Sequence, residues 1–369
     1  MKLAVPILLA LHGLIHFVGF AKAFAIGNTA EFTKELSKPI GLLWLLTGLL
    51  FILSGTLLFF KREGWPIYAM LALIVSQLLI FTVWSDAKYG TIANIIILIS
   101  AIIAFGTERF ENSYKKDVIS AMESTSVIDQ LITEKDIEHL PLVVKKYLRY
   151  VGVVGKPKVV NVKIRFEGEM RDKGKDWFPF TSEQYNFFDS PTRLFFMKAK
   201  IKGLPTNGYH RYVKEGASMH IKLISLFPVV DIDTPVLFPT ETVTFFNDLC
   251  LFAPAALIDK RIAWETLDDL SVKASLTTNN ISISAILYFN EDGQLINFVS
   301  NDRYSISEME TFPFSTPASN YENINGYHLP TYGEAIWHYR DGDFVYGKFN
   351  VKNIEYNISN KKLSEDENE

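Results

Sequence analysis

The chain has 369 residues, room for two or three domains, and its 37 Lys and Arg against 41 Asp and Glu give a net charge of −4. The charge is uneven, because residues 1–106 hold seven basic and four acidic side chains, whereas residues 107–369 carry a net charge of −7. This acidic part has no cluster of Lys and Arg with interleaved aromatic residues, which excludes nucleic acid as a partner. The single cysteine, Cys250, excludes an intrachain disulfide. Because CxxC spacing is also missing, we expect no metal site and no cofactor.

Four apolar runs occupy the first 106 residues, at 3–21, 40–60, 66–84 and 91–106. Each is close to the ~20 residues that a helix needs to cross ~30 Å of hydrocarbon. We therefore predict a four-helix transmembrane module at residues 1–106, in a multi-pass protein of the plasma membrane. Lys and Arg number six against four on alternate sides of the spans, which favours both termini, and hence the soluble part, in the cytoplasm.

Two histidines, His12 and His16, lie four residues apart in the first run, so a helix places them on one face. This spacing suits a metal ion or the axial ligands of a haem. With Gly13 and Gly19 permitting close helix packing, the alternative is hydrogen bonding to polar side chains of neighbouring spans: Ser54, Thr56, Ser76, Gln77 or Asn94. We favour hydrogen bonding and predict that the pair binds no metal.

Residues 107–132 are polar and are predicted to form a juxtamembrane linker, helical between residues 108 and 126. A further helix is predicted from Thr133 to Val151, because Thr133 and Asp136 form a capping-box pattern and Gly152 follows the apolar stripe. Pro141 interrupts this helix, which is either kinked at that residue or starts afresh there.

From residue 159 the apolar period changes from 3.6 to 2, as expected for half-buried strands. Asn, Asp and Gly at residues 279–280, 292–293, 325–326 and 341–342 suit tight hairpin turns. We predict roughly ten short antiparallel strands, in runs around 159–170, 177–188, 193–203, 207–215, 217–225, 262–267, 271–278, 281–290, 294–303, 332–340 and 344–356. Six aromatic residues are expected on the dry face of their sheet: Phe166, Phe180, Phe187, Phe196, Phe289 and Phe298. The charged tail, 359–369, is predicted to be disordered.

One apolar helical run, residues 235–264, lies between two groups of strands. Its core places Phe245, Phe246 and Leu249 on one stripe, and Pro254 begins a second short helix that ends at Ile258. A helix this apolar needs a sheet to cover it. The sequence thus predicts an α+β chain, in which a four-helix transmembrane bundle precedes a curved antiparallel sheet, or half-barrel, that wraps around an inserted helix at residues 133–358.

Catalytic templates are missing from the sequence, which has no GxSxG, P-loop or HExxH motif, and we assign no catalytic residue. Two carboxylates, Glu241 and Asp248, lie seven residues apart, so one face of the inserted helix carries both. In one interpretation, the two carboxylates form a polar centre together with Arg303. In the other, Glu241 stabilises the N-terminus of the helix, and Asp248 is solvated or bonded to a strand.

Several short motifs of the second half occur together: Leu140-Pro141, Trp177-Phe178-Pro179-Phe180, Glu241 to Pro254, Trp264-Glu265, Asp302-Arg303-Tyr304 and Asn325-Gly326 to Pro330. Over about residues 130–357 the chain resembles an uncharacterised bacterial family, a domain of unknown function. This resemblance implies a bacterial inner membrane. The stretch from Tyr321 to Tyr356 is also similar to the lipoprotein-carrier (LolA-like) half-barrels, which implies a concave sheet that holds acyl chains.

These observations together predict a membrane-anchored module that binds an apolar ligand, which is a lipid or an acyl chain. The membrane lipids are its other expected partners. The ligand-binding residues expected in its cleft are Phe166, Phe180, Phe196, Glu241, Phe245, Asp248, Trp264 and Arg303. We expect binding rather than catalysis. Two alternatives stay open: an enzyme that acts on a lipid-like substrate with Glu241, Asp248 and Arg303, and a scaffold or envelope protein with a filled core and no ligand.

Overall fold

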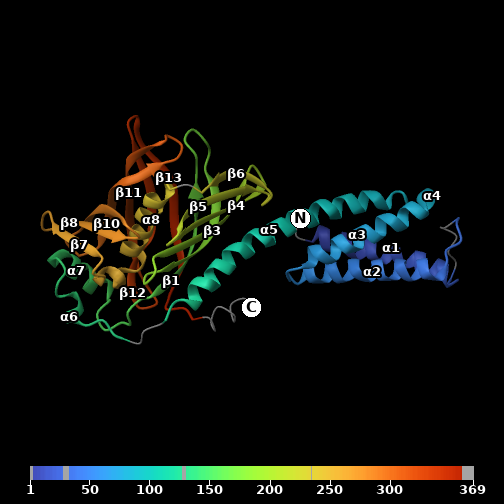
Figure 1. Cartoon of the computed structure of the whole chain (residues 1–369), viewed down its shortest axis with the longest axis horizontal. Coiled ribbons are helices and arrows are strands. Elements are labelled where there is room, and N and C mark those ends of the chain that lie inside the picture. The colour runs from blue at the N-terminus through green and yellow to red at the C-terminus, as the bar shows by residue number, and fades with distance from the viewer. Residues whose placement is uncertain (1–2, 28–32, 127–129, 234, 360–369) are drawn as a thin grey trace. The chain divides into compact units, whose positions relative to one another are not determined.

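The computed structural model describes residues 3–27, 33–126, 130–233 and 235–359 (Figure 1). The chain divides into two compact units, Met1–Asn112 and Ser113–Glu369, and each is described by itself. The predicted disordered tail, 359–369, lies outside the described residues except for its first residue, and so do residues 127–129 of the predicted linker.

The first unit contains four helices that are long and apolar enough to cross a membrane, as the sequence predicts. Ile74, Leu78 and Phe81 are each more than half exposed, and apolar surface of this kind is typical of helices that face lipid. The fourth apolar helix continues without a break through the polar residues that follow it. The helices are α1 (Ala4–Ala23), α2 (Lys38–Phe59), α3 (Trp65–Thr82), the short α4 (Trp84–Ala87) and α5 (Gly90–Glu123).

His12 and His16 are buried and form hydrogen bonds between helices, so the predicted hydrogen bonding of the histidine pair is confirmed. His12 Nε2 lies 2.8 Å from Asn94 Oδ1, and His16 Nε2 lies 2.9 Å from Ser76 Oγ. The predicted close approach is also present, because a Cβ added to Gly13 would lie 2.8 Å from the carbonyl oxygen of Gly48 on α2.

Replacing both histidines with alanine is expected to lower the unfolding free energy of the helical unit by about 0.6–2 kcal/mol, because two hydrogen bonds between helices are lost. Reversible unfolding in mixed micelles measures this difference. Thr56→Ala is the control, since the Thr56 hydroxyl bonds only to the carbonyl oxygen of Ile52 on its own helix. A haem absorption band, or a stoichiometric metal that disappears in the double variant, would contradict the prediction.

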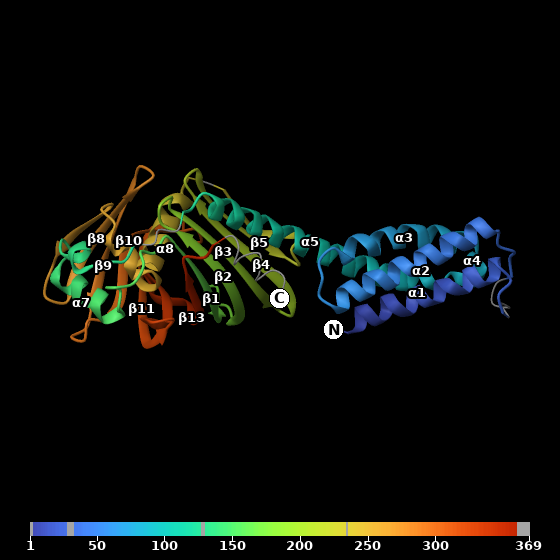
Figure 2. The same ribbon diagram turned by 90° about the horizontal axis from the view of Figure 1, so that it is seen from below.

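The second unit contains one antiparallel sheet of 13 strands, which curls into the predicted half-barrel (Figure 2). The spatial order is β6-β5-β4-β3-β2-β1-β13-β12-β11-β10-β9-β8-β7, so the first strand pairs with the last. The strands are β1 (Asn161–Met170), β2 (Phe178–Phe187), β3 (Thr192–Ile201), β4 (Leu204–Val213), β5 (Gly216–Leu223), β6 (Phe227–Ile232), β7 (Ile262–Thr266), β8 (Ser271–Thr278), β9 (Ile281–Phe289), β10 (Leu295–Ser305), β11 (Glu310–Ile324), β12 (Tyr327–Tyr339) and β13 (Gly342–Tyr356).

Two of these strands, β6 and β11, are missing from the sequence prediction, and both contain proline. Proline cannot donate to a strand ladder and argues against a central strand. Pro228 is tolerated because β6 lies at the edge of the sheet. In β11, the pairing is interrupted beside Pro313 and again beside Pro317. The inserted helices therefore follow the sixth strand rather than the fifth.

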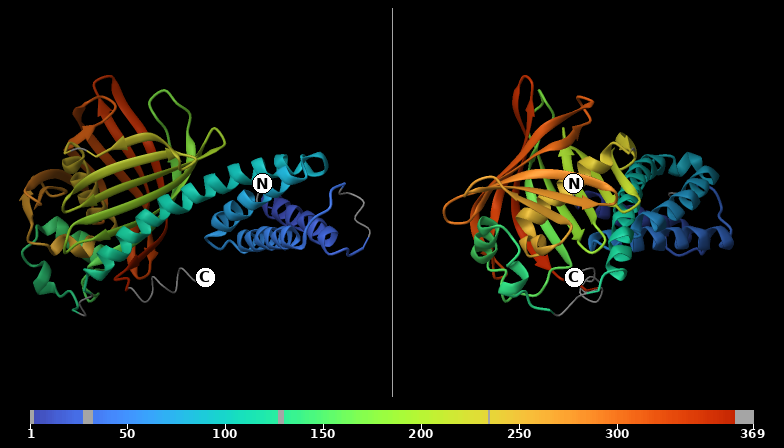
Figure 3. Two further views of the ribbon diagram at one scale, coloured as in Figure 1. Left: turned by 45° about the vertical axis from the view of Figure 1, so that its right-hand side comes forward. Right: turned by 60° about the vertical axis from the view of Figure 1, so that its left-hand side comes forward.

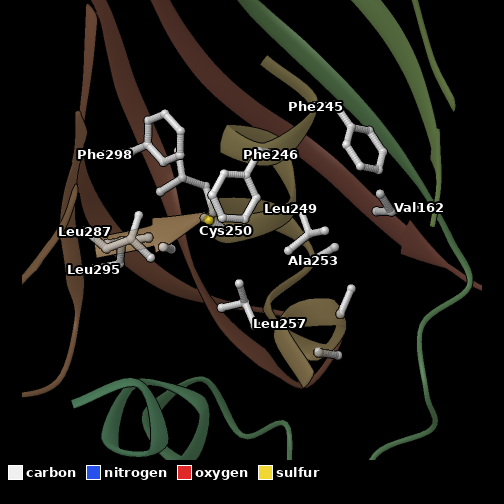
Figure 4. Close-up of a cluster of buried hydrophobic side chains, with 14 of the residues drawn as sticks. Val162, Phe245, Phe246, Leu249, Cys250, Ala253, Leu257, Leu287, Leu295 and Phe298 are labelled. Carbon is white, nitrogen blue, oxygen red and sulfur yellow. The ribbon is translucent and has the colours of Figure 1, made fainter. Parts of the chain in front are cut away.

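The inserted helices lie against the concave face of the sheet, as predicted (Figures 1 and 3). They are α8 (Leu237–Phe252) and the short η1 (Pro254–Ile258), which begins at the predicted proline. Phe246 and Leu249 of α8 and Leu257 of η1 belong to the same buried cluster as Leu287 and Phe298 of the sheet (Figure 4). The apolar stripe of the helix and the inward residues of the strands thus form one core.

The helix predicted from residue 133 to 151 is divided in two and starts afresh at Pro141. Its parts are α6 (Glu134–Ile137), preceded by the predicted capping box of Thr133 and Asp136, and α7 (Leu142–Val151). Tyr147 of α7 donates a hydrogen bond of 2.8 Å to the carbonyl oxygen of Cys250, which ties α7 to α8.

Residues 113–123 of α5 cover part of the other, convex face of the sheet. Tyr114 stacks on Phe196 with ring centroids 5.3 Å apart and also contacts Tyr185, which in turn stacks on Phe187. Phe187 and Phe196 therefore lie on the convex face, and the expectation that they share the concave face with Phe166 is wrong. Alternation already separates Phe187 from Phe180, because the two are an odd number of positions apart on one unbroken strand. Both faces carry aromatic residues here because the sheet is dry on both sides where α5 covers it.

Candidate functional site

A cavity of about 460 Å³ remains on the concave side of the sheet, where α8 does not fill the curve. Its walls come from β1 to β6, from β10 to β13 and from one side of α8. Many of the side chains that line it are apolar or aromatic, among them Phe166, Met197, Met219, Leu251, Phe314 and Trp337. Its volume is within the ~300–1,000 Å³ typical of small-molecule pockets.

Two carboxylates of α8 meet one arginine of β3 in the wall of this cavity. Arg193 Nε donates to Asp248 Oδ2 at 2.7 Å, and Arg193 Nη1 lies 3.3 Å from Glu241 Oε2. Gln184 Nε2 also donates to Asp248 Oδ2, at 2.7 Å, and its own amide oxygen accepts from Arg193 Nη2 at 3.1 Å. All three charged side chains are more than nine-tenths buried, so these bonds replace the water that each charge gives up.

The spacing of the carboxylates explains why a single arginine reaches both. Seven residues make about two turns of helix, so Glu241 and Asp248 lie on one face of α8, as the sequence indicates. Asp248 is bonded to strand side chains, which was one of the two interpretations of this residue. Glu241 also faces a strand, because His210 Nδ1 of β4 lies 3.5 Å from its Oε1 atom.

The environment of Glu241 favours its ionised form. Burial by itself raises the pKa of this carboxyl, but the hydrogen bond with His210 and the charges of Arg193, His210 and Arg303 outweigh burial. The pKa of Glu241 is thereby lowered to about 2. Both carboxylates are thus held by other side chains, and neither is free to act as a bare acid and base pair.

Arg303 enters the cavity wall through a β-bulge. Ser300 and Arg303 are three residues apart on β10, yet they pair with Phe314 and Phe312, which are two residues apart on β11. The extra residue turns Arg303 to the face of Phe314, which is a common effect of bulges near binding sites. Its guanidinium carbon lies 3.9 Å from the centre of the Phe314 ring and 5.0 Å from that of Trp337.

The structure brings four of the eight predicted ligand-binding residues into the cavity wall: Phe166, Glu241, Asp248 and Arg303. The other four lie elsewhere. Phe180 packs on Phe349, Phe245 packs between Phe188 and Tyr212, Trp264 lies on β7, and Phe196 lies on the convex face. These four side chains help to build the unit and do not contact the cavity.

Sequence reasoning missed Arg193, His210, Gln184 and Asn247, all of which line the cavity. One signal was present for Gln184, because this amide stands at an inward position of β2 where the strand pattern calls for an apolar residue. Arg193 carries the same signal, because it is in phase with the inward residues Met197 and Ala199 of β3, whereas His210 carries none. Among the described residues, no group of three His, Cys, Asp or Glu side chains gathers in a geometry that could hold a metal ion.

The chain belongs to the family of unknown function DUF6544, whose model matches residues 130–349. This confirms the resemblance to an uncharacterised family, and the matched residues include α8 and every charged side chain of the cavity wall. No curated protein matches the chain. Among solved structures, a LolA superfamily protein from Nitrosomonas europaea is similar, with a TM-score of 0.34 and 9% identity over 60% of this chain and 94% of that chain.

Glu241→Gln is expected to destabilise the second unit at neutral pH. The difference in unfolding free energy between this variant and the wild type is expected to shrink as the pH falls from about 4.5 to about 2. Because folding lowers the pKa of Glu241, the ionised carboxylate stabilises the fold above its ordinary pKa of 4.5. This contribution is lost as the pH falls through the lower pKa of the folded state.

Urea unfolding of the full chain in detergent measures this difference when it is followed by labelling of Cys250. This thiol is the single cysteine of the chain and is fully buried in α8, so labelling reports on the second unit and not on the apolar helices of the first. A dipyridyl disulfide is a suitable label because it reacts with a thiol even at acidic pH. Glu322→Gln, at an exposed position, is the control and is expected to change stability little at any pH. A Glu241→Gln difference that stays constant over the whole range would contradict the prediction.

Proposed function

We propose that this protein is a membrane-anchored binding protein that holds an apolar ligand, a lipid or an acyl chain, in the cavity of its half-barrel. The observation that carries the proposal is the cavity itself, which remains open although α8 and η1 already occupy the concave face. Apolar surface that the protein does not cover with its own side chains is stabilised when a ligand covers it. An alkyl chain matches the aromatic and methionine side chains of the wall.

The anchor is the helical unit, and its four apolar helices support a place in a membrane. We propose the bacterial inner membrane, with both termini and the half-barrel on the cytoplasmic side. The basis is the six-to-four distribution of Lys and Arg in the segments that join the helices. In this location the lipids of the same membrane supply the acyl chains that the cavity is proposed to take.

An enzyme acting on a lipid-like substrate is less well supported than a binding protein. Acid and base catalysis needs a carboxyl group that can exchange a proton with the substrate near neutral pH. Glu241 is instead held ionised by a lowered pKa, and Asp248 accepts hydrogen bonds from Arg193, Gln184 and Asn186. A scaffold without a ligand is the remaining alternative, and an empty cavity in the purified protein would favour it.

Native mass spectrometry of the full chain is expected to show a bound lipid or fatty acid, and organic extraction is expected to release it. Thr244→Phe, on the side of α8 that lines the cavity, adds a ring to the cavity and is expected to reduce the bound fraction several-fold. Thr277→Phe makes the same change at an exposed position of β8 and is expected to leave binding intact. Wild-type protein that carries no lipid and binds none on addition would contradict the proposal.

The orientation is tested with single introduced cysteines, because native Cys250 is buried. Ser120→Cys in α5 is expected to react with an impermeant maleimide only after the cells are permeabilised. Glu35→Cys, which precedes α2, is expected to react from outside intact cells. The opposite pattern would reverse the proposed orientation and would leave the number of membrane helices unchanged.

A further inference from the structure

Arg303 has hydrogen-bond donors that the protein does not use. Its Nε atom is buried without a hydrogen-bond partner, and its guanidinium makes no hydrogen bond or ion pair within the described parts of the chain. Its contacts are the aromatic rings of Phe314, Trp337 and Tyr346. A guanidinium carries five N–H donors, and leaving them unsatisfied in a largely apolar wall is unfavourable.

Arg193, another arginine of the cavity wall, shows the opposite arrangement. Arg193 uses Nε, Nη1 and Nη2, with acceptors on Asp248, Glu241 and Gln184. Glu241 does act on Arg303 through its charge, but the two groups form no ion pair, and both oxygens of Glu241 face other partners. Three arginines therefore line the cavity. Arg193 completes the fold, Arg171 donates through Nε to the carbonyl oxygen of Val345, and the donors of Arg303 stay available.

Aromatic stacking leaves the donors of the two Nη atoms of Arg303 accessible for a ligand, whereas Nε is buried. The rings contact the flat face of the Arg303 guanidinium through cation–π attraction, whereas the N–H groups lie in its plane. A planar fork of donors held in this way matches the two oxygens of a carboxylate or a phosphate.

A neighbouring amide adds a second unused group. Asn247 is 8% exposed, and its Oδ1 atom is buried without a partner while its Nδ2 atom donates to Thr316 Oγ1 at 3.1 Å. Thr316 and Phe314 are two residues apart on β11, so Asn247 and Arg303 face the same strip of the cavity wall. A half-turn of the amide lets the Thr316 hydroxyl donate to Oδ1 and presents Nδ2 to an anionic ligand.

We propose that the cavity takes an amphiphile with an acidic oxygen head group, a carboxylate or a phosphate, and that Arg303 binds this head. The inference rests on the proposed binding of an apolar chain and names the class of ligand. The charged side chains that line the cavity cancel, because Arg171, Arg193 and Arg303 stand against Asp172, Glu241 and Asp248. The inference therefore rests on the unused donors of Arg303 and not on a net positive charge. Arg303 is thus the residue that distinguishes an acidic lipid from a neutral one.

The test is a head-group series at constant chain length on the full chain in phosphatidylcholine nanodiscs. Dodecanoic acid, dodecyl phosphate, dodecanol and methyl dodecanoate are titrated, and signals from empty nanodiscs are subtracted. At least one acidic probe is expected to bind about tenfold or more tightly than dodecanol, since hydrogen bonds to charged groups are the strong ones. Whichever of dodecanoic acid and dodecyl phosphate binds tighter identifies a carboxylate or a phosphate as the head group.

Arg303→Gln is expected to remove this preference while dodecanol binds as before, and Arg303→Lys is expected to keep part of it because the charge remains. Arg340→Gln, at an exposed arginine of the β12–β13 turn, is the control and is expected to keep the full preference. Protection of Cys250 from labelling checks that each variant is folded. The series on the unmodified protein decides the question even if an Arg303 variant fails to fold.

Equal affinity for acidic and neutral probes would overturn the role of Arg303 while leaving the binding of an apolar chain intact. An acidic preference that persists in folded Arg303→Gln would also overturn it. If no probe binds at all, the proposed function itself fails.

Discussion

The ion pairs of Arg193 with Glu241 and Asp248 tie α8 to the concave face of the sheet. A buried charge is costly unless it is paired, and removing one partner of such a pair typically costs about 3–5 kcal/mol. One arginine on β3 meets two carboxylates that lie two turns apart on α8. This contact fixes the position of the helix along its own axis and its rotation about that axis. The cavity depends on that position, because its walls are the sheet on one side and the same face of α8 on the other.

The sheet is covered on its concave face and on part of its convex face, and different elements cover the two. On the concave side, α8 and η1 form the apolar core with the inward residues of the strands, and the cavity is the part of the curve that they leave unfilled. On the convex side, residues 113–123 of α5 contribute Tyr114 against Phe196 and Asp117, which accepts hydrogen bonds from Tyr209 and Arg211. Residues 113–123 of α5 are therefore part of the folded half-barrel through specific contacts.

Local irregularities of the strands place the groups that a ligand would meet. The bulge between Ser300 and Arg303 moves a charged side chain from one face of β10 to the other. Pro313 lies opposite this bulge on β11, the strand that also supplies Phe314. It interrupts the pairing of β11 with β10 at this point. An uninterrupted ladder would place Arg303 on the face opposite Phe298. The polar strip of the cavity thus depends on a departure from regular pairing.

The sequence by itself determined the parts of this protein that follow from short-range periodicity. Four apolar runs became the four long helices, alternation became most of the strands, and Pro254 and Gly152 marked the helix ends at which they stand. Tertiary structure alone decided which face of each strand points into the half-barrel. A strand that is covered on both sides does not alternate between apolar and polar residues, so its sequence does not identify the inner face. It also decided the partners of the charges, since Arg193 and Glu241 are 48 residues apart and meet only when the sheet curls around α8.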